Sequence, residues 1–492
     1  MRSPYGKGAA KGAQSCPDAL GPLTGAMLYV STRGDAPALD FEAVTLAGLA
    51  KDGGLYVPEA WPTFSRDQIR ALAGLSYVET AVAILSPFVG DSLSQGELRT
   101  LCDAAYGRFA HAAVTPLVQL DSRQWVLELF HGPTLAFKDV ALQLLGLLFE
   151  RFLSTRDTHL TVVGATSGDT GSAAIDALAG RAKVDLFMLH PKGRVSDVQR
   201  RQMTTVLAPN IHNIAIEGSF DDAQAMVKAM FADKGFAGRF TLSAVNSINW
   251  ARLAAQIVYY FYAAVRLGAP ERPVAFSVPT GNFGDVFAGY VAAKMGLPVA
   301  KLIVATNVND ILHRALSEGD YSVGSVTPTA APSMDIQVSS NFERLLFDLH
   351  GRDGAALAAS MKGFESARKF NLTPAMRAQA GELFTSARVD PEAMNMAMRR
   401  ANEQSAMILD PHTAIGYAAA VAADLPADVP VVTLATAHPA KFRDAVERAT
   451  GQRPALPIRV GDLFDREERY ETLPGDLATV QAYIAERATP AA

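Results

Sequence analysis

The sequence predicts an α/β protein with two doubly wound parallel-sheet domains and a smaller N-terminal α+β domain. Two observations support this prediction. From about residue 125 onward, short runs rich in Val, Ile and Phe alternate with helical segments, which is typical of parallel strands covered by helices on both faces. In several of these units a turn rich in Gly, Ser or Thr joins the strand to its helix, as a strand–turn–helix unit requires.

The N-terminal region has a mixed pattern and is expected to form a domain over residues 27–112. One short strand and three helices are predicted there, at residues 28–32, 40–50, 66–75 and 76–89. Residues 1–26 are rich in Gly, Ala and Pro and contain no apolar stretch of the kind found in secretory signals. We expect them to be a disordered leader, or to precede a true start at Met27.

The rest of the chain supplies the two sheet domains. Strands followed by helices are expected at residues 158–165, 184–190, 210–218, 273–279, 300–307 and 429–435. Ser219 and Asp222 have the spacing of an N-terminal cap for the helix after the third of these strands. Farther on, residues 355–367 and 376–387 are predicted to be amphipathic helices. The expected boundaries are 113–160 with 260–492 for the larger domain and 161–259 for the smaller one.

The composition argues against several classes of protein. Lys and Arg total 45 against 50 acidic residues, for a net charge of −5, so no nucleic-acid partner is expected. The most apolar helical stretch, residues 251–267, contains Gln256 and two arginines, which predicts a buried core helix and no membrane span. Two cysteines, Cys16 and Cys102, are too few for a disulfide framework or a metal cluster. They fit a reducing compartment, and the cytoplasm is the expected location.

Ligands of open α/β sheets bind at the carboxyl ends of the strands, and four segments of this chain are expected there. The first is FHGPTLAFKD, in which Lys138 precedes a long apolar helix. Its apolar neighbours would desolvate the ammonium group and lower its pKa, as a lysine that forms a Schiff base requires. An ordinary lysine in the first turn of a helix is the alternative.

The second and third segments are rich in glycine. Residues 280–284, Thr-Gly-Asn-Phe-Gly, join a strand to a helix, where free N–H groups suit a phosphate. They match neither GxGxxG nor a Walker A loop, and a tight turn without a ligand would also explain them. Residues 164–171 combine three glycines with the hydroxyl groups of Ser167 and Thr170, and such a nest can hold a carboxylate. A structural turn would explain these glycines but not the density of hydroxyl groups.

The fourth segment is VVTLATAHPAKF, in which Thr436 directly follows a buried strand. Its hydroxyl is expected at the ligand edge of the sheet, although a helix cap is an alternative. Together, a desolvated lysine, a phosphate nest, a carboxylate nest and a hydroxyl at a strand end fit pyridoxal phosphate with an amino-acid substrate.

Eight segments in this chain are long and unusual strings. They are YVSTRG (29–34), DGGLYVPE (52–59), FHGPTLAFKD (130–139), GATSGDTGSAA (164–174), NSINWARLAAQ (246–256), PTGNFGD (279–285), DPHTAIGY (410–417) and LATAHPAKF (434–442). In content and order they resemble the threonine synthase family, in its longer bacterial and fungal form, within the fold type II pyridoxal-phosphate enzymes. The resemblance covers residues from about 28 to 445.

The resemblance implies a cofactor, a reaction and a set of site residues. The reaction would convert O-phospho-L-homoserine and water to L-threonine and phosphate, the last step of threonine biosynthesis. Lys138 would bind pyridoxal phosphate as a Schiff base, and Thr436 would meet the pyridine nitrogen. The cofactor phosphate would lie on Gly281, Asn282, Phe283, Gly284 and Asp285. The substrate would contact Ser167, Gly168, Asp169, Thr170 and Arg252. No metal site is expected.

Three points within this interpretation stay open. Arg252, Arg33 and Lys441 are all candidates for binding the substrate phosphate, because cations match phosphate oxygens, and each could instead be a structural charge. Asp169 stands where fold type II relatives commonly carry an Asn that contacts the ring hydroxyl, so its own contact with the ring is undecided. A neutral hydroxyl at Thr436 is expected to make the ring a milder electron sink than an aspartate would, which favours elimination and replacement over transamination.

Two alternative functions remain. One is another fold type II activity, such as a serine/threonine dehydratase or a β-replacement synthase, which needs no second phosphate site. The other is a non-catalytic relative that keeps the fold, against which the presence of Lys138 argues. A nicotinamide-dependent dehydrogenase is disfavoured because the chain has no GxGxxG with a later acidic partner.

Overall fold

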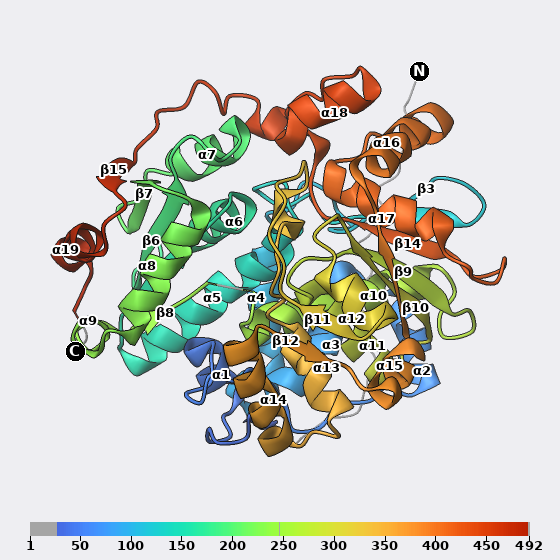
Figure 1. The fold of residues 1–492 in the computed structure, drawn as a ribbon, viewed down its shortest axis with the longest axis horizontal. Coiled ribbons are helices and arrows are strands. Elements are labelled where there is room, and N and C mark those ends of the chain that lie inside the picture. The colour runs from blue at the N-terminus through green and yellow to red at the C-terminus, as the bar shows by residue number, and fades with distance from the viewer. Residues whose placement is uncertain (1–26, 246, 491–492) are drawn as a thin grey trace, which may run out of the picture.

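The computed structural model describes residues 27–245 and 247–490, so the interpretation of residues 1–26 lies outside the described residues. The molecule contains two sheet-bearing bodies side by side (Figure 1), each with strands between helices. The expected α/β architecture with two parallel sheets is therefore confirmed. No described helix is long and apolar enough to cross a bilayer.

The larger body is built on a six-stranded sheet with the order β13-β10-β9-β14-β4-β3, in which only β3 runs antiparallel to its neighbour. Its strands are β3 (Leu117–Gln119), β4 (Gln124–Glu128), β9 (Val274–Pro279), β10 (Val299–Thr306), β13 (Phe384–Arg388) and β14 (Val431–Ala435). A separate antiparallel pair is formed by β11 (Asp320–Ser322) and β12 (Lys369–Asn371).

Alternate residues of the central strands enter two different cores, because successive strand side chains point to opposite faces. In β9, Val274, Phe276 and Val278 belong to the main core, whereas Ala275 belongs to a second core beneath α17. Burial on both faces explains why these strands read as continuous apolar runs.

Helices pack on this sheet and on one another; most of them contribute to the main core, and the last three in chain order contribute to the second core. They are α5 (Lys138–Arg156), α10 (Trp250–Arg266), α11 (Gly284–Lys294), α12 (Ile311–Ser317), α13 (Phe342–Leu349), α14 (Gly354–Ala367), α15 (Pro374–Gly381), α16 (Pro391–Ser405), α17 (Pro411–Ala422) and α18 (Arg443–Thr450). Short 3₁₀ turns lie at Pro332–Met334, Pro439–Phe442 and Ile458–Val460. Helix α10 is buried from Trp250 to Val265, so the prediction of a buried core helix is confirmed.

The smaller body is a five-stranded, fully parallel sheet with the order β15-β7-β6-β5-β8. Its strands are β5 (Leu160–Ala165), β6 (Val184–Pro191), β7 (Ile211–Glu217), β8 (Leu242–Ser243) and β15 (Glu471–Pro474). Its helices are α6 (Asp169–Leu178), α7 (Asp197–Thr204), α8 (Phe220–Ala232), α9 (Lys234–Ala237) and α19 (Leu477–Arg487). Helix α8 begins with the predicted capping box, in which Ser219 and Asp222 bond reciprocally.

The N-terminal region packs against α5 and α10 of the larger body. A two-stranded sheet pairs β1 (Tyr29–Ser31) with β2 (Tyr56–Pro58). The helices are α1 (Phe41–Ala47), α2 (Arg66–Ala71), α3 (Tyr77–Val89) and α4 (Gln95–Tyr106), with 3₁₀ turns at Leu72–Gly74 and Gly90–Ser92. Its apolar side chains join the main core.

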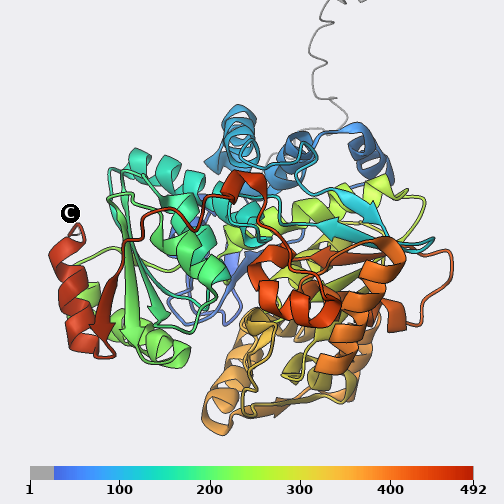
Figure 2. The same ribbon diagram turned by 90° about the horizontal axis from the view of Figure 1, so that it is seen from above.

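Three segments differ from the sequence-based expectation. The predicted helix over 376–387 is wrong in its second half, since α15 ends at Gly381 and Phe384–Arg388 forms edge strand β13. Pairing with β10 decides this outcome, because tertiary context overrides local helical periodicity. Helix α10, mostly within the range expected for the smaller domain, packs on α3, α5 and α11. The segment β15–α19 lies within the expected larger domain but crosses to the edge of the smaller sheet (Figure 2).

Candidate active site

The four predicted segments follow parallel strands at their carboxyl ends. Strands β4, β14 and β9 are neighbours in the six-stranded sheet and lead into residues 130–138, 436–441 and 280–284. Strand β5 of the smaller sheet leads into residues 166–169. The segments that carry Lys138 and Thr436 touch directly, because the amide of Phe137 donates to the carbonyl of Thr436 at 2.8 Å. Thr436 is itself buried.

Lys138 is the first residue of α5, and its side chain is buried. Its Nζ lies 3.4 Å from Oδ2 of Asp169. Burial lowers the pKa of Lys138, and the charges of Arg252 and Lys441 add to this effect, while Asp169 opposes it. The net result is a lowered pKa. An amine in this environment is more readily available as a nucleophile or a base than an exposed lysine.

A buried carboxylate shapes the loop before Lys138. The amide and the hydroxyl of Thr134 each donate to the Asp139 side chain at 2.7 Å, which closes the turn between them. Burial raises the pKa of Asp139 to about 6, although the bonds from Thr134 act in the opposite direction. This turn fixes the backbone from which Lys138 projects.

Asp169 begins α6 and is surrounded by donors. Its Oδ1 accepts from Nζ of Lys441 at 2.9 Å and from Nε2 of Gln199 at 2.8 Å. Burial alone would raise the pKa of Asp169, but Lys441 and Lys138 outweigh it and hold the pKa well below its usual range. The preceding Gly168 has φ +137°, and a Cβ there would lie 2.5 Å from the Gln199 side chain. Only glycine fits this approach.

Ser167 and Thr170 flank these two residues and are half-buried. The hydroxyl of Thr166 accepts from the amides of Gly168 and Gly171 at 2.9 and 2.8 Å. Hydrogen bonds within the turn therefore stabilise it.

Residues 281–284 form a cradle of backbone amides at the start of α11. Within the described chain, none of these four amides donates a hydrogen bond to another residue. Phe283 adopts φ +62°, in the left-handed region that non-glycine residues rarely enter. Its ring is held against Phe342 and Phe384 at centroid distances of 5.2 and 5.7 Å. An unfilled set of amides at a helix N-terminus is suited to a phosphate.

The segment before α13 stabilises the cradle by hydrogen bonds to its carbonyl groups. Ser339 donates its hydroxyl to the carbonyl of Gly281 at 2.8 Å. Asn341 donates to the carbonyl of Asn282 with its amide at 3.1 Å and with its side chain at 3.0 Å. Gly281 is also confined, because a Cβ at this position would lie 2.5 Å from the carbonyl of Ser333.

Asp285 follows the cradle and accepts hydrogen bonds from the hydroxyls of Tyr259 and Tyr260. Burial raises the pKa of Asp285 to about 6, while the two tyrosines and the charge of Lys138 lower it.

Arg252, near the start of α10, differs from the other two candidate cations. Its side chain is only 3% exposed, it has no acidic partner among the described residues, and its Nη1 has no hydrogen-bond partner there. Burial lowers the pKa of Arg252 to about 10. By contrast, Arg33 pairs with Glu343 at 3.1 Å and Glu365 at 3.2 Å, and Lys441 pairs with Asp169. An unpaired buried guanidinium is costly unless an anion joins it.

Several residues around the site escaped the sequence analysis. Gln199, Ser339 and Asn341 reach it from loops or helices whose sequence carries no recognisable signal. The adjacent Tyr259 and Tyr260 did carry one, since two hydroxyls within a buried helix need acceptors.

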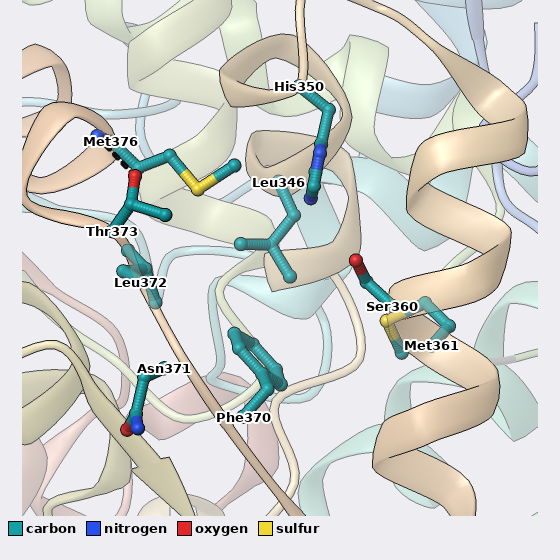
Figure 3. A pocket seen from close by; sticks show the side chains of 9 residues that line it. All are labelled: Leu346, His350, Ser360, Met361, Phe370, Asn371, Leu372, Thr373 and Met376. Atoms are coloured by element: carbon teal, nitrogen blue, oxygen red, sulfur yellow. Dashed lines mark hydrogen bonds between the residues drawn. The ribbon is translucent and has the colours of Figure 1, made fainter.

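Two cavities lie elsewhere. One of about 150 Å³ is enclosed by α13, α14, β12 and the start of α15 (Figure 3), and none of its lining residues belongs to the predicted site. Another of about 480 Å³ borders residues 128–131 and 438–439 but is not lined by Lys138, Asp169 or Arg252.

Comparison with protein-family models first defines the class. Residues 109–437 match the model described as "Pyridoxal-phosphate dependent enzyme", which agrees with the parallel sheets and the buried lysine. The protein is thus a fold type II enzyme that uses pyridoxal phosphate. Residues 28–106 match "Threonine synthase N terminus", and residues 413–484 match "Threonine synthase, C-terminal".

Individual relatives narrow the class to one family. The threonine synthase of Pseudomonas aeruginosa is 57% identical over 461 residues, covering 94% of this chain and 98% of that protein. The crystal structure of a threonine synthase with bound pyridoxal phosphate from Brucella melitensis superposes with a TM-score of 0.92 at 51% identity, over 94% and 99% of the two chains. The threonine synthase of Escherichia coli gives 0.80 at 33% identity, over 94% and 100%. The chain belongs to the threonine synthase family.

Proposed function

We propose that the protein converts O-phospho-L-homoserine and water to L-threonine and phosphate, as a cytoplasmic enzyme without nucleic-acid or membrane partners. The observation that supports this most directly is that two separate sets of donors in the predicted site lack a partner. The amides of 281–284 have no acceptor among the described residues, and Arg252 has no acidic partner there. A cofactor phosphate and a substrate phosphate would supply the missing partners.

The residues fit pyridoxal phosphate as follows. Lys138 would hold the cofactor covalently, Gly281, Asn282, Phe283 and Gly284 would bind its phosphate through their amides, and Thr436 would meet the pyridine nitrogen. Asp285 would anchor the cradle through Tyr259 and Tyr260. Bound pyridoxal phosphate supplies a ring that delocalises negative charge from the carbon next to the amino group.

The chain itself would bind the substrate and move its protons. Ser167, Gly168 and Thr170 would hold the carboxylate, with Asp169 behind them, and Arg252 would hold the phosphate. Lys138 Nζ, with its pKa lowered by burial, would take the proton from the α-carbon and would then transfer protons at the β-carbon. Water would add at the β-carbon after phosphate has left. Phosphate release separates this activity from that of a dehydratase or a β-replacement synthase.

The assignment of Lys138 is tested on the purified protein loaded with the cofactor. Borohydride reduction followed by peptide mapping should place the pyridoxyl group on Lys138, and Lys138→Ala should reduce threonine formation by about 10³-fold or more, since both a nucleophile and a base are lost. Lys192→Met, on the surface of the smaller body, is the matched control. A pyridoxyl group on another lysine would contradict the assignment.

The assignment of Arg252 is tested by steady-state kinetics that follow threonine and phosphate together. Arg252→Met should lower kcat/KM for O-phosphohomoserine by about 10- to 100-fold, mainly through KM, because one charge-assisted contact to the substrate phosphate is removed. Arg266→Met, at the exposed end of the same helix, should leave kcat/KM unchanged. An unchanged KM in Arg252→Met would show that another cation binds this phosphate.

A further inference from the structure

The carboxylate of Asp169 bridges two buried lysines. Its Oδ2 lies 3.4 Å from Nζ of Lys138, and its Oδ1 lies 2.9 Å from Nζ of Lys441. The side chain of Lys441 is fully buried. It also donates to the carbonyl of Thr134 at 2.8 Å. Lys441 therefore ties together the loop that carries Lys138, the loop that carries Asp169 and its own turn after β14.

Charged groups on four other elements interact electrostatically with Lys138. Asp169 comes from α6, Lys441 from the turn after β14, Arg252 from α10 and Asp285 from α11. Asp169 contacts Lys138 directly, and Lys441 and Gln199 share the other oxygen of the same carboxylate. A lone carboxylate at this distance would favour the protonated form of Lys138.

The pairing with Lys441 limits this effect. A buried carboxylate that already holds one full positive charge attracts a second proton-bearing group less strongly. When Lys138 turns from Asp169 toward the cofactor, Lys441 and Gln199 still satisfy the carboxylate, so no unpaired charge is left in the interior.

We propose that Lys441 is a positioning residue that neutralises Asp169 permanently and so keeps the amine of Lys138 free to act as a base. The inference rests on the proposed role of Lys138 as the cofactor lysine. Lys441 touches neither the substrate nor the reacting atoms in this scheme. It acts through Asp169, and its loss changes the proton affinity of the Lys138 nitrogen.

The test follows the visible absorption of the loaded enzyme as a function of pH, since this absorption reports protonation of the Lys138 nitrogen in its bond to the cofactor. Lys441→Met should raise the midpoint of this titration by about 1 unit or more, because Asp169 is left as an unbalanced anion. Asp169→Asn should lower the midpoint, because the attracting charge is gone. The double variant should return toward the value of the unsubstituted enzyme.

Charge balance predicts midpoint shifts of opposite direction in the two single variants, and these shifts should cancel in the double variant. If Lys441 had a purely structural role, the two midpoint shifts would not be opposite in direction. Lys441→Arg, which keeps the charge, should leave the midpoint close to that of the unsubstituted enzyme, and Lys192→Met is the surface control. If Lys441→Met does not fold, Lys441→Gln, which also removes the charge but keeps a donor group, takes its place, and the same upward shift is expected.

An unchanged midpoint in Lys441→Met, or shifts in the same direction for both single variants, would overturn the inference. Borohydride mapping separates this failure from that of the proposed function. A pyridoxyl group on Lys138 with unshifted midpoints would remove only the role of Lys441, whereas a pyridoxyl group elsewhere would remove the role of Lys138 as well.

Discussion

Asp285 accepts from two phenol hydroxyls and, within the described structure, pairs with no cation by a direct ion pair. Burial raises its pKa from 3.8 to about 6 because the hydroxyls only partly replace the lost hydration. The pKa of Asp169 is lowered although this residue is also buried, because Lys441 and Lys138 contact it directly. Single partners therefore decide how readily each carboxylate of the site takes up a proton.

The raised pKa of Asp285 predicts a pH-dependent stability. The folded cofactor-free protein holds this proton more tightly than the unfolded chain, so the contribution of Asp285 is full below its ordinary pKa and is lost as pH rises through about 6. In Asp285→Asn this loss disappears. The free energy of unfolding of the variant, relative to the unsubstituted protein, should therefore increase between pH 4 and 7 by about 1–3 kcal/mol.

Urea unfolding at a series of pH values measures this difference. Asp91→Asn, on the exposed surface of the N-terminal region, is the matched control. A difference between Asp285→Asn and the unsubstituted protein that stays constant from pH 4 to 7 would contradict the assignment of proton uptake to Asp285.

Helices α5, α6, α10 and α11 all begin at the site, with Lys138, Asp169 and Gly284 as the first residues of three of them and Arg252 in the first turn of the fourth. The N-terminus of a helix carries partial positive charge and unfilled amides. Four such ends around one lysine create a positive environment, which suits two phosphates and a carboxylate.

The start of α13 supports this arrangement although it lies outside the predicted motifs. Arg344 is fully buried and donates to the carbonyls of Tyr56 at 3.0 Å and Ile248 at 2.6 Å, and to the side chain of Asn341. Asn341 in turn holds the carbonyl of Asn282. One short segment thus links the N-terminal sheet, the start of α10 and the phosphate cradle.

Asn341→Ala should weaken cofactor binding, because the carbonyl of Asn282 loses its side-chain donor and the cradle is held less firmly. We expect the dissociation constant of pyridoxal phosphate to rise by about 5- to 30-fold, which corresponds to about 1–2 kcal/mol for one buried hydrogen bond. Equilibrium titration of the cofactor-free protein measures this change. Asn371→Ala, on the exposed strand β12, should bind the cofactor normally, and equal weakening in both variants would contradict the role of Asn341.

The molecule contains two main sheets, and the chain passes from one to the other more than once. We propose three domains: the N-terminal region at 27–112, a larger domain around the six-stranded sheet, and a smaller domain around the five-stranded sheet. Residues 471–487 return to the smaller domain, where β15 pairs with β7 and α19 packs on α8 (Figure 2). Its sheet is therefore completed only after the larger domain has been synthesised.

Ile484 in α19 is fully buried in the core of the smaller domain together with Val480. Ile484→Ala should lower the local stability of that domain by about 2–4 kcal/mol, because a buried aliphatic side chain is replaced by a void. Amide hydrogen exchange should detect this as faster exchange in β7 and α8, with β9 and β14 unchanged. Glu486→Ala, exposed on the same helix, is the control, and uniform acceleration in both sheets would contradict a domain-local effect.

The strand–turn–helix units and the segments that carry the chemistry follow from local patterns in the amino-acid sequence. Continuous apolar runs such as that of β9 can only be buried on both faces, and the turns after them must lie at one edge of a sheet. Lys138, residues 281–284, Thr436, Ser167 and Thr170 were therefore identifiable from local pattern, whereas Asp169 was singled out only through the family resemblance. Their individual roles remain proposals.

The partners of these strands and charged side chains depend on how the chain folds. Strand β13 and strand β15 exist because β10 and β7 offer open edges, and local periodicity cannot reveal an edge that lies far away in the chain. In the same way, the distinction between Arg252, Arg33 and Lys441 depends on which carboxylates lie nearby. Charge is a property of the residue, whereas its pairing and its pKa depend on groups that folding brings together.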